Sequence, residues 1–104
     1  MDATELINRY NAGERDFQGI DLTRANLSGT DLSGANFSQA NLNGAILQRA
    51  NLNQTNLSGA DLSWADMGFA NLMGADLTGA NMEMTILFRA RLKGATMPDG
   101  TIKR

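Results

Sequence analysis

The chain contains no histidine and no cysteine, and it has one tryptophan, one tyrosine and one proline among its 104 residues. Without histidine and cysteine, the commonest activated nucleophiles and general bases are excluded, together with imidazole or thiolate metal sites and disulfides. No apolar run approaches the ~20 residues needed to span a bilayer. The N-terminal stretch has no basic segment followed by an apolar one, so we expect no export signal, no membrane partner and a cytoplasmic location.

Charge is also scarce. Nine Lys and Arg residues against eleven Asp and Glu residues give a formal net charge of −2. A nucleic-acid-binding protein needs a basic face for the phosphates, and an acidic imitation of nucleic acid needs a large excess of carboxylates. The composition fits neither class, and we expect no nucleic-acid partner.

What the sequence does contain is a large apolar residue at every fifth position. This register continues through seventeen consecutive units without an insertion or deletion. The residue two before the large one is Ala in twelve units and Thr in three, and the residue immediately before it is Asp or Asn in thirteen. The central residues, which we predict to form the core, are Phe17, Leu22, Leu27, Leu32, Phe37, Leu42, Leu47, Leu52, Leu57, Leu62, Met67, Leu72, Leu77, Met82, Leu87, Leu92 and Met97.

A period of five is incompatible with one helix or one strand. On an α-helix, residues five apart are separated by about 140°, so the apolar residues would form no stripe. In a strand, side chains alternate with period two, so an odd repeat would place successive leucines on opposite faces. The chain must therefore turn once per unit, which predicts a solenoid whose coils are joined by backbone hydrogen bonds.

Units such as ANLSG, ADLSW and ADLTG resemble the pentapeptide-repeat family over about residues 15–97. This resemblance implies an all-β fold, a right-handed quadrilateral β-helix (β-solenoid) of about four coils with four units in each. Residues 20 apart would then stack on one side of the coil. Phe17 and Phe37 are accordingly expected to be stacked neighbours.

The N-terminal segment, residues 1–13, is predicted to be a short capping α-helix. Leu6, Ile7 and Tyr10 share one helix face, Thr4 is a candidate N-cap, and Gly13 ends the helix. Its apolar face would cover the first coil of the β-helix at residues 14–97.

The C-terminal segment, residues 98–104, is predicted to be a tail that closes the stack only in part. End-to-end pairing of two chains there is one alternative. A cluster of cations lies nearby, which either binds an anionic surface or keeps the coil edge solvated against aggregation. These cations are Arg89, Arg91, Lys93, Lys103 and Arg104.

The repeat itself offers no catalytic site. Its aspartates are interchangeable with asparagine in the pattern, which indicates a role in solvating the outside and bonding neighbouring loops. A convex rod has no cleft in which two carboxylates could converge for glycoside hydrolysis or calcium binding. We therefore predict no enzymatic activity, no cofactor and no metal.

Departures from the pattern gather on one side of the C-terminal half. Exposed apolar residues there indicate a protein-interaction patch, although single exposed apolar residues are also ordinary. A weak homodimer through this half is one interpretation. The candidate patch residues are Ile46, Trp64, Phe69, Met84, Ile86 and Phe88.

Two functions remain open. The first is a non-enzymatic structural or protein-interaction module with an unknown protein partner. The alternative, implied by the resemblance, is a DNA-mimicking regulator of DNA gyrase or topoisomerase. This sequence departs from that picture because it is short, nearly neutral, without an inserted loop, and expected to carry arginines on the same sides as its acids.

Overall fold

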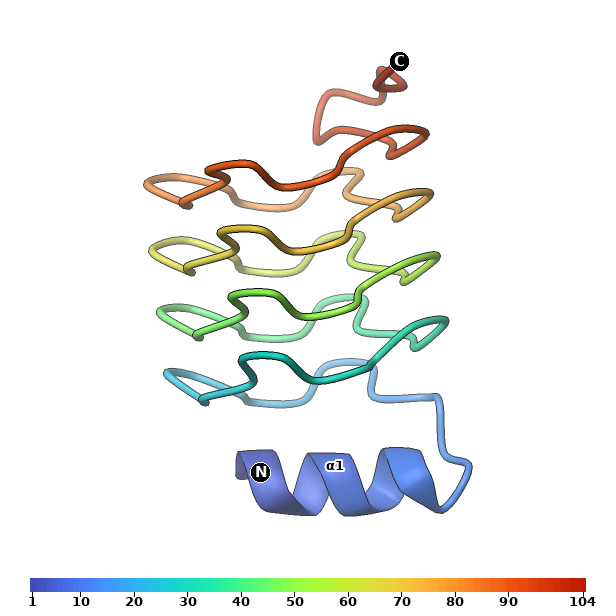
Figure 1. Cartoon of the computed structure of the whole chain (residues 1–104), viewed down its shortest axis with the longest axis vertical. Coiled ribbons are helices and arrows are strands. Elements are labelled where there is room, and N and C mark those ends of the chain that lie inside the picture. Colours follow the sequence, from blue (N-terminus) through green and yellow to red (C-terminus); the bar gives the residue numbers. More distant parts are fainter.

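The computed structural model describes all 104 residues as a stack of coils closed at one end by a single helix (Figure 1). Helix α1 spans Ala3–Asn11. The coils contain no extended strand and are joined by thirteen single-residue parallel bridges, each between residues 20 apart. The molecule measures 33 × 24 × 22 Å. No helix has both the length and the apolar character required to cross a bilayer.

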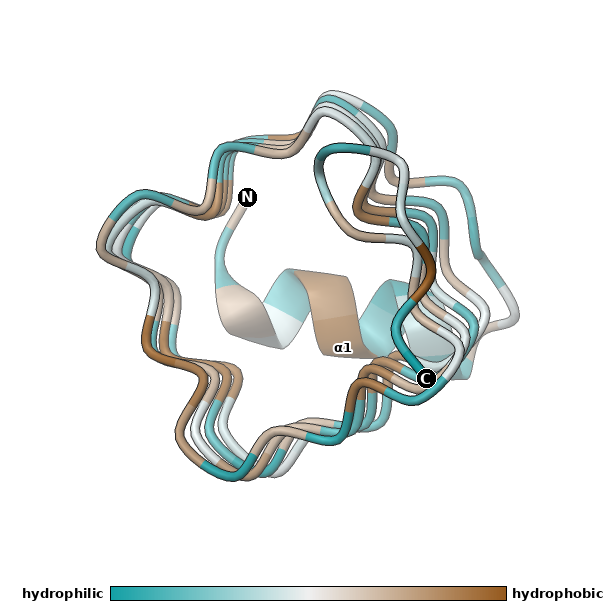
Figure 2. Ribbon diagram, turned by 90° about the horizontal axis from the view of Figure 1, so that it is seen from above, coloured by the Kyte–Doolittle hydropathy of each residue, from teal (hydrophilic) through white to brown (hydrophobic).

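Each five-residue unit ends in a tight turn. The carbonyl of the central residue accepts a hydrogen bond from the N–H three residues later, as between Leu22 and Ala25 at 3.0 Å. Between coils, the N–H of Leu27 donates to the carbonyl of Ile46 at 2.7 Å, and the N–H of Ile46 donates back to Ala25 at 2.9 Å. Four such units make one 20-residue coil, and successive coils superpose when the stack is viewed from above (Figure 2).

The stacking defines four sides, numbered in chain order by the central residues that lie above one another. Side 1 is therefore opposite side 3, and side 2 is opposite side 4. Side 1 is centred on Phe17, Phe37, Leu57, Leu77 and Met97; side 2 on Leu22, Leu42, Leu62 and Met82; side 3 on Leu27, Leu47, Met67 and Leu87; side 4 on Leu32, Leu52, Leu72 and Leu92.

The interior contains the central residues and the small residues two before them. Thirteen of the seventeen central residues are buried, and each contributes about 1.5–3 kcal/mol by its removal from water. The rings of Phe17 and Phe37 stack with centroids 5.5 Å apart, which confirms the expected vertical pairing. The four central residues of the last coil are only partly buried, because no coil lies above them: Met82, Leu87, Leu92 and Met97.

Helix α1 covers the first coil with its apolar face. Leu6 is completely buried, and Tyr10 is 9% exposed. The Tyr10 hydroxyl donates to the carbonyl of Ser33 at 2.7 Å, which ties the helix to side 4 of the first coil. Arg15 lies over the Tyr10 ring, with its Cζ atom 3.7 Å from the ring centroid. The helix is therefore both packed against the stack and hydrogen-bonded to it.

The two helix ends are closed by different devices. Gly13, with φ of 102°, allows the N–H of Glu14 to donate to the carbonyl of Arg9 at 3.0 Å, as in a Schellman motif. At the start, the prediction of Thr4 as N-cap is wrong. The N-cap is Asp2, whose carboxylate accepts the N–H of Glu5 at 2.8 Å, because the helix begins one residue before Thr4.

The C-terminal tail turns back and pairs with one part of the last coil. Thr96 and Ile102 form an antiparallel bridge, and the N–H of Lys103 donates to Ala95 at 2.8 Å. The rest of this edge is open. Five N–H groups that would join a further coil donate to no acceptor in the protein; they belong to Met82, Met84, Leu87, Arg89 and Leu92.

Candidate interaction surface

The Asp or Asn before each central residue has a structural task. In all thirteen such units its Oδ1 atom accepts the N–H two residues later, as in Asp21 with Thr23 and Asn41 with Asn43, both at 3.0 Å. This is the Asx-turn bond, which satisfies an N–H that the ladder leaves free. Asp and Asn are interchangeable there because either side chain provides the acceptor oxygen.

These bonds also hold several carboxylates in the ionised form. The hydroxyl and N–H of Thr23 lower the pKa of Asp21, and Thr78 does the same to the pKa of Asp76. For Asp31, the backbone N–H of Ser33 is the main cause of a lowered pKa. No group of three or more acidic residues is close enough together to hold a metal ion.

Four units lack Asp or Asn before the centre, and two of them lie on side 3. At Thr96 nothing is lost, because the residue two positions later is Pro98, which has no N–H. On side 3, Ile46 and Ile86 deprive the N–H groups of Gln48 and Phe88 of the Asx acceptor. Side 3 therefore gives up local hydrogen bonds and displays isoleucine instead.

Side 3 and its two corners carry all the large exposed apolar residues of the coils. Exposure ranges from 39% for Ile46 to 64% for Trp64. We call this set the side 3 surface; it consists of Ile46, Trp64, Phe69, Met84, Ile86 and Phe88. Met73, which the pattern places on side 4, is only half-buried and lies apart from it.

The corners beside side 3 also carry the strained backbone. In sixteen of the seventeen units, all except the last, the second residue after the centre has positive φ, which glycine adopts without cost. Eight of these sixteen residues are glycine and eight are not. Six of the eight that are not lie at the two corners of side 3: Arg24, Trp64 and Met84 before it, and Arg49, Phe69 and Arg89 after it.

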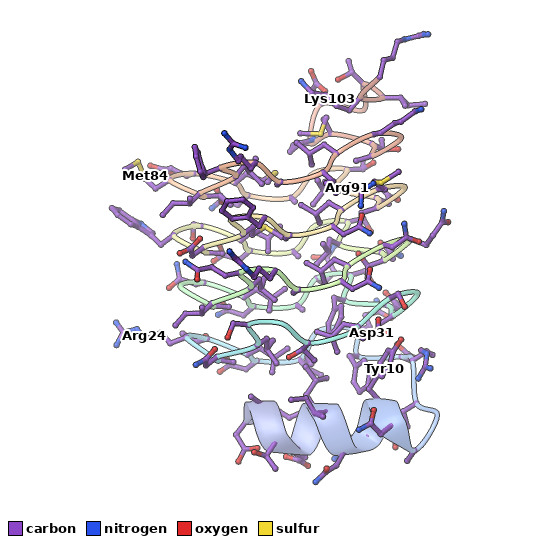
Figure 3. All side chains as sticks on the ribbon, viewed as in Figure 1. Tyr10, Arg24, Asp31, Met84, Arg91 and Lys103 are labelled. Atoms are coloured by element: carbon purple, nitrogen blue, oxygen red, sulfur yellow. The ribbon has the colours of Figure 1, made fainter.

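The remaining two, Gln39 and Gln54, lie at the other corners, where every further position is glycine. A non-glycine residue in this conformation costs on the order of 1–3 kcal/mol. Such strain concentrates at sites where a side chain is needed for a task other than folding. Figure 3 shows Arg24 and Met84 projecting from the same edge of the stack.

Aromatic rings and guanidinium groups cluster at the corner that follows side 3. The rings of Phe69 and Phe88 meet edge to face with centroids 5.7 Å apart. The Cζ atom of Arg49 lies 4.6 Å from the Phe69 centroid, and that of Arg89 lies 5.6 Å from the Phe88 centroid. Both contacts are within the range of cation–π attraction.

Charge is divided unevenly among the sides. The positions next to the centres of sides 1 and 2 carry five acids and no base: Asp16, Asp76, Asp21, Asp61 and Glu83. The expected mixing of arginines with acids is therefore found only on sides 3 and 4, where Asp66 is accompanied by the corner arginines and Asp31 by Arg91 and Lys93. Arg24 lies at the corner that side 2 shares with side 3, so side 2 meets a base only at its edge.

The one pocket of the molecule lies elsewhere. It has a volume of about 440 Å³ and runs along the outer, polar side of α1. Its lining includes Glu5, Arg9 and Glu14, which are joined by ion pairs. With one apolar residue among its seven lining residues, it has little of the apolar lining typical of ligand pockets.

Comparison with models of known protein families identifies the family of this chain. The family model for pentapeptide repeats matches residues 20–59 and 55–94, eight copies in all. The chain belongs to the pentapeptide-repeat family. Comparison with curated protein sequences gives no significant match.

Three similar solved structures come from photosynthetic organisms. A pentapeptide repeat protein of Nostoc, alr5209, is 45% identical with a TM-score of 0.89, over 90% of this chain and 78% of that one. Rfr23 of the cyanobacterium Cyanothece is 34% identical with a TM-score of 0.53, over 86% of this chain and 64% of that one. A pentapeptide repeat protein of the Arabidopsis thaliana thylakoid lumen is 28% identical with a TM-score of 0.57, over 89% and 72%.

Proposed function

We propose that this protein is a non-enzymatic interaction module, a right-handed quadrilateral β-helix that presents the side 3 surface to another protein. The observation that carries the proposal is the gathering of six exposed large apolar side chains on one of four sides. Contiguous apolar patches of this kind mark interaction sites more often than scattered single residues do.

Two further observations support the same surface. Ile46 and Ile86 replace residues that would have made an Asx-turn bond, each worth about 0.5–1.5 kcal/mol. Trp64, Phe69 and Met84 occupy positive-φ positions that favour glycine. The chain thus forgoes stability at several points of side 3 in order to display large apolar groups.

Photo-crosslinking tests this proposal. A photoreactive phenylalanine analogue at Trp64 or Phe88 is expected to capture the same protein from cells of the source organism. The analogue at Gln39 or Asn81, on the other sides, is the matched control and is expected not to capture it. Binding of the purified partner should then be lost in the Trp64→Ser, Phe88→Ser variant. Capture from all four positions alike would refute an interface on side 3.

Homodimerisation through the same half of the molecule stays a prediction. Size-exclusion chromatography with chemical cross-linking tests it. A dimer that persists in the Trp64→Ser, Phe88→Ser variant would exclude the side 3 surface as its interface.

One observation favours a second candidate function, imitation of DNA. Sides 1 and 2 adjoin each other, and the positions next to their centres carry five acids and no base, as the flank of a DNA-like rod would. A gyrase supercoiling assay tests this function. Inhibition or protection at low micromolar protein that is lost on Asp21→Asn, Asp61→Asn substitution would support it, and an unaffected assay would refute it.

A further inference from the structure

We propose that the partner segment that binds the side 3 surface is acidic and amphipathic, and that Arg24, Arg49 and Arg89 bind its carboxylates. This inference rests on the proposed function and adds the chemistry of the partner. It starts from the charged residues of side 3, because an apolar patch alone does not explain why arginines lie at its corners.

The three arginines have no carboxylate partner and no hydrogen-bond acceptor in the protein. Both ion pairs of the molecule lie at α1, where Arg9 meets Glu5 and Glu14. Arg15, by contrast, donates to the carbonyls of Tyr10 and Glu14, both at 2.8 Å. The guanidinium groups of Arg24, Arg49 and Arg89 donate no hydrogen bond to any protein acceptor.

Side 3 has only one carboxylate of its own, and it is already engaged. Asp66 accepts the N–H of Gly68 at 3.1 Å and the side-chain amide of Gln48 at 2.6 Å. The arginines therefore leave a net positive charge around an apolar surface. A partner that covers this surface must supply the compensating negative charge.

Two of the guanidinium groups lie near aromatic rings. The Cζ atoms of Arg49 and Arg89 are 4.6 and 5.6 Å from the ring centroids of Phe69 and Phe88, and the N–H groups of both guanidinium groups have no protein acceptor. A guanidinium edge presents a fork of donors that matches both oxygens of a carboxylate. Because this planar fork is pre-organised, less side-chain entropy is lost for each hydrogen bond that it forms.

The arginines span most of the stack. Arg24, Arg49 and Arg89 belong to the first, second and fourth coils, so they spread over three coil spacings of about 4.8 Å each. A partner segment lying along this length of roughly 14 Å needs about ten helical residues. We therefore expect a segment with apolar residues on one face and Glu or Asp at its margins.

Charge also argues against two other occupants. A second copy that used the same surface would bring three arginines against three arginines. A flat anionic membrane that covered side 3 would also meet the acids of the adjoining side 2, which a narrow peptide segment along side 3 leaves uncovered.

Fluorescence anisotropy with defined peptides tests the inference. The probe is a labelled 14-residue amphipathic helix with Leu and Phe on one face and Glu at its margins. Two matched probes replace every Glu by Gln or by Lys and keep the apolar residues. The Glu peptide is expected to bind at least tenfold more tightly than the Gln peptide, and the Lys peptide is expected not to bind. A rise from 50 to 500 mM NaCl should weaken the Glu peptide about tenfold.

Substitutions of the arginines and of the exposed apolar residues test where the peptide binds. Each of Arg24→Gln, Arg49→Gln and Arg89→Gln should weaken the Glu peptide about fivefold. The controls Arg91→Gln and Lys93→Gln, on side 4, should not weaken it. The variant Trp64→Gly, Phe69→Gly, Met84→Gly relieves backbone strain, so it should lose the peptide while its unfolding midpoint is unchanged or higher. A fall in that midpoint would assign these side chains to folding instead of binding.

The inference is overturned if the three peptides bind equally, if none binds, or if vesicles containing phosphatidylserine bind in place of the Glu peptide. The two proposals fail separately. If the crosslinked partner is lost on Trp64→Gly, Phe69→Gly, Met84→Gly but retained on substitution of the three arginines, the interaction module stands and the acidic partner does not.

Discussion

The two ends of the stack are built from the same repeat, but they differ in the burial of their apolar side chains and in their backbone hydrogen bonds. At the N-terminal end, α1 buries Leu6 completely and ties Tyr10 to the first coil. At the C-terminal end, the central residues Leu87 and Leu92 are partly exposed, and five backbone N–H groups have no acceptor. Figure 3 shows Tyr10 of α1 between the helix and the first coil, whereas Lys103 lies at the opposite end of the stack.

This contrast shows how much of the stability of each coil comes from the elements above and below it. In a solenoid, a repeat is stabilised by its own residues and by the interfaces above and below it. A central coil has both interfaces, the first coil has a helix in place of one, and the last coil has only a short tail. The same substitution should therefore have a different effect at each level.

The largest difference is expected for a charge placed inside the stack. Leu57→Asp puts a carboxylate at a fully buried position, where an unpaired charge costs several kcal/mol, comparable with the whole stability of a small domain. Leu92→Asp introduces the same group beside solvent at the open end. We expect Leu57→Asp to abolish the native circular dichroism spectrum and Leu92→Asp to retain it. An unchanged unfolding midpoint for Leu57→Asp would refute the assignment of inner and outer positions.

A smaller difference in the free energy of unfolding is expected when a leucine at each end is truncated to alanine. Leu6→Ala removes a completely buried side chain under the first coil and should lower the free energy of unfolding by about 2–5 kcal/mol. Leu92→Ala truncates a partly exposed side chain, so it should cost less than half as much. Urea unfolding monitored by Trp64 fluorescence measures both. Equal losses would mean that the helix is no better a cap than the tail.

Hydrogen exchange should show the contrast without any substitution. The N–H groups of Leu22 and Leu27 donate across the first coil interface and should exchange at least about a thousandfold more slowly than those of Leu87 and Leu92, which have no acceptor. Residue-resolved exchange monitored by NMR or mass spectrometry checks this. Strong protection of Leu87 and Leu92 would indicate that a second molecule covers the open end.

The smallest effect concerns pH. Hydrogen bonds from neighbouring hydroxyl and N–H groups lower the folded-state pKa of Asp21, Asp76 and Asp99, and that of Asp31 falls chiefly through the N–H of Ser33. A carboxyl group with a lowered pKa contributes stability above its unfolded value of about 3.9 and loses it as the pH falls through the folded value. The urea midpoint should therefore fall slightly below about pH 4.

Asparagine gives the control for this prediction, because its oxygen accepts the same N–H without titrating. The triple variant Asp21→Asn, Asp31→Asn, Asp76→Asn should keep its fold, and its urea midpoint should depend less on pH. An undiminished acid response would assign the effect to other carboxylates.

The inside of the molecule follows from the sequence almost completely, because a five-residue period allows only one inward pattern. The stacking of Phe17 on Phe37 follows from that period together with the four units per coil that the family resemblance implied. The outside was less predictable. The positive φ of Trp64 and Phe69 is imposed by the neighbouring coils against the preference of the residues, so no local signal reveals it. The N-cap was misjudged because Thr4 is also a favoured cap residue, although Asp2 ranks above it by type.

Because Asp and Asn make the same Asx-turn bond, the net charge of this rod can be changed without changing its fold. Six of the thirteen acceptor positions are Asp and seven are Asn, and each bond is made by an oxygen that both side chains possess. Exchanging every Asn for Asp would lower the formal charge from −2 by seven, to −9, and the reverse exchange of every Asp would raise it by six, to +4. One backbone could thus serve partners of opposite polarity, and a designer could retune its electrostatic field without touching a single core contact.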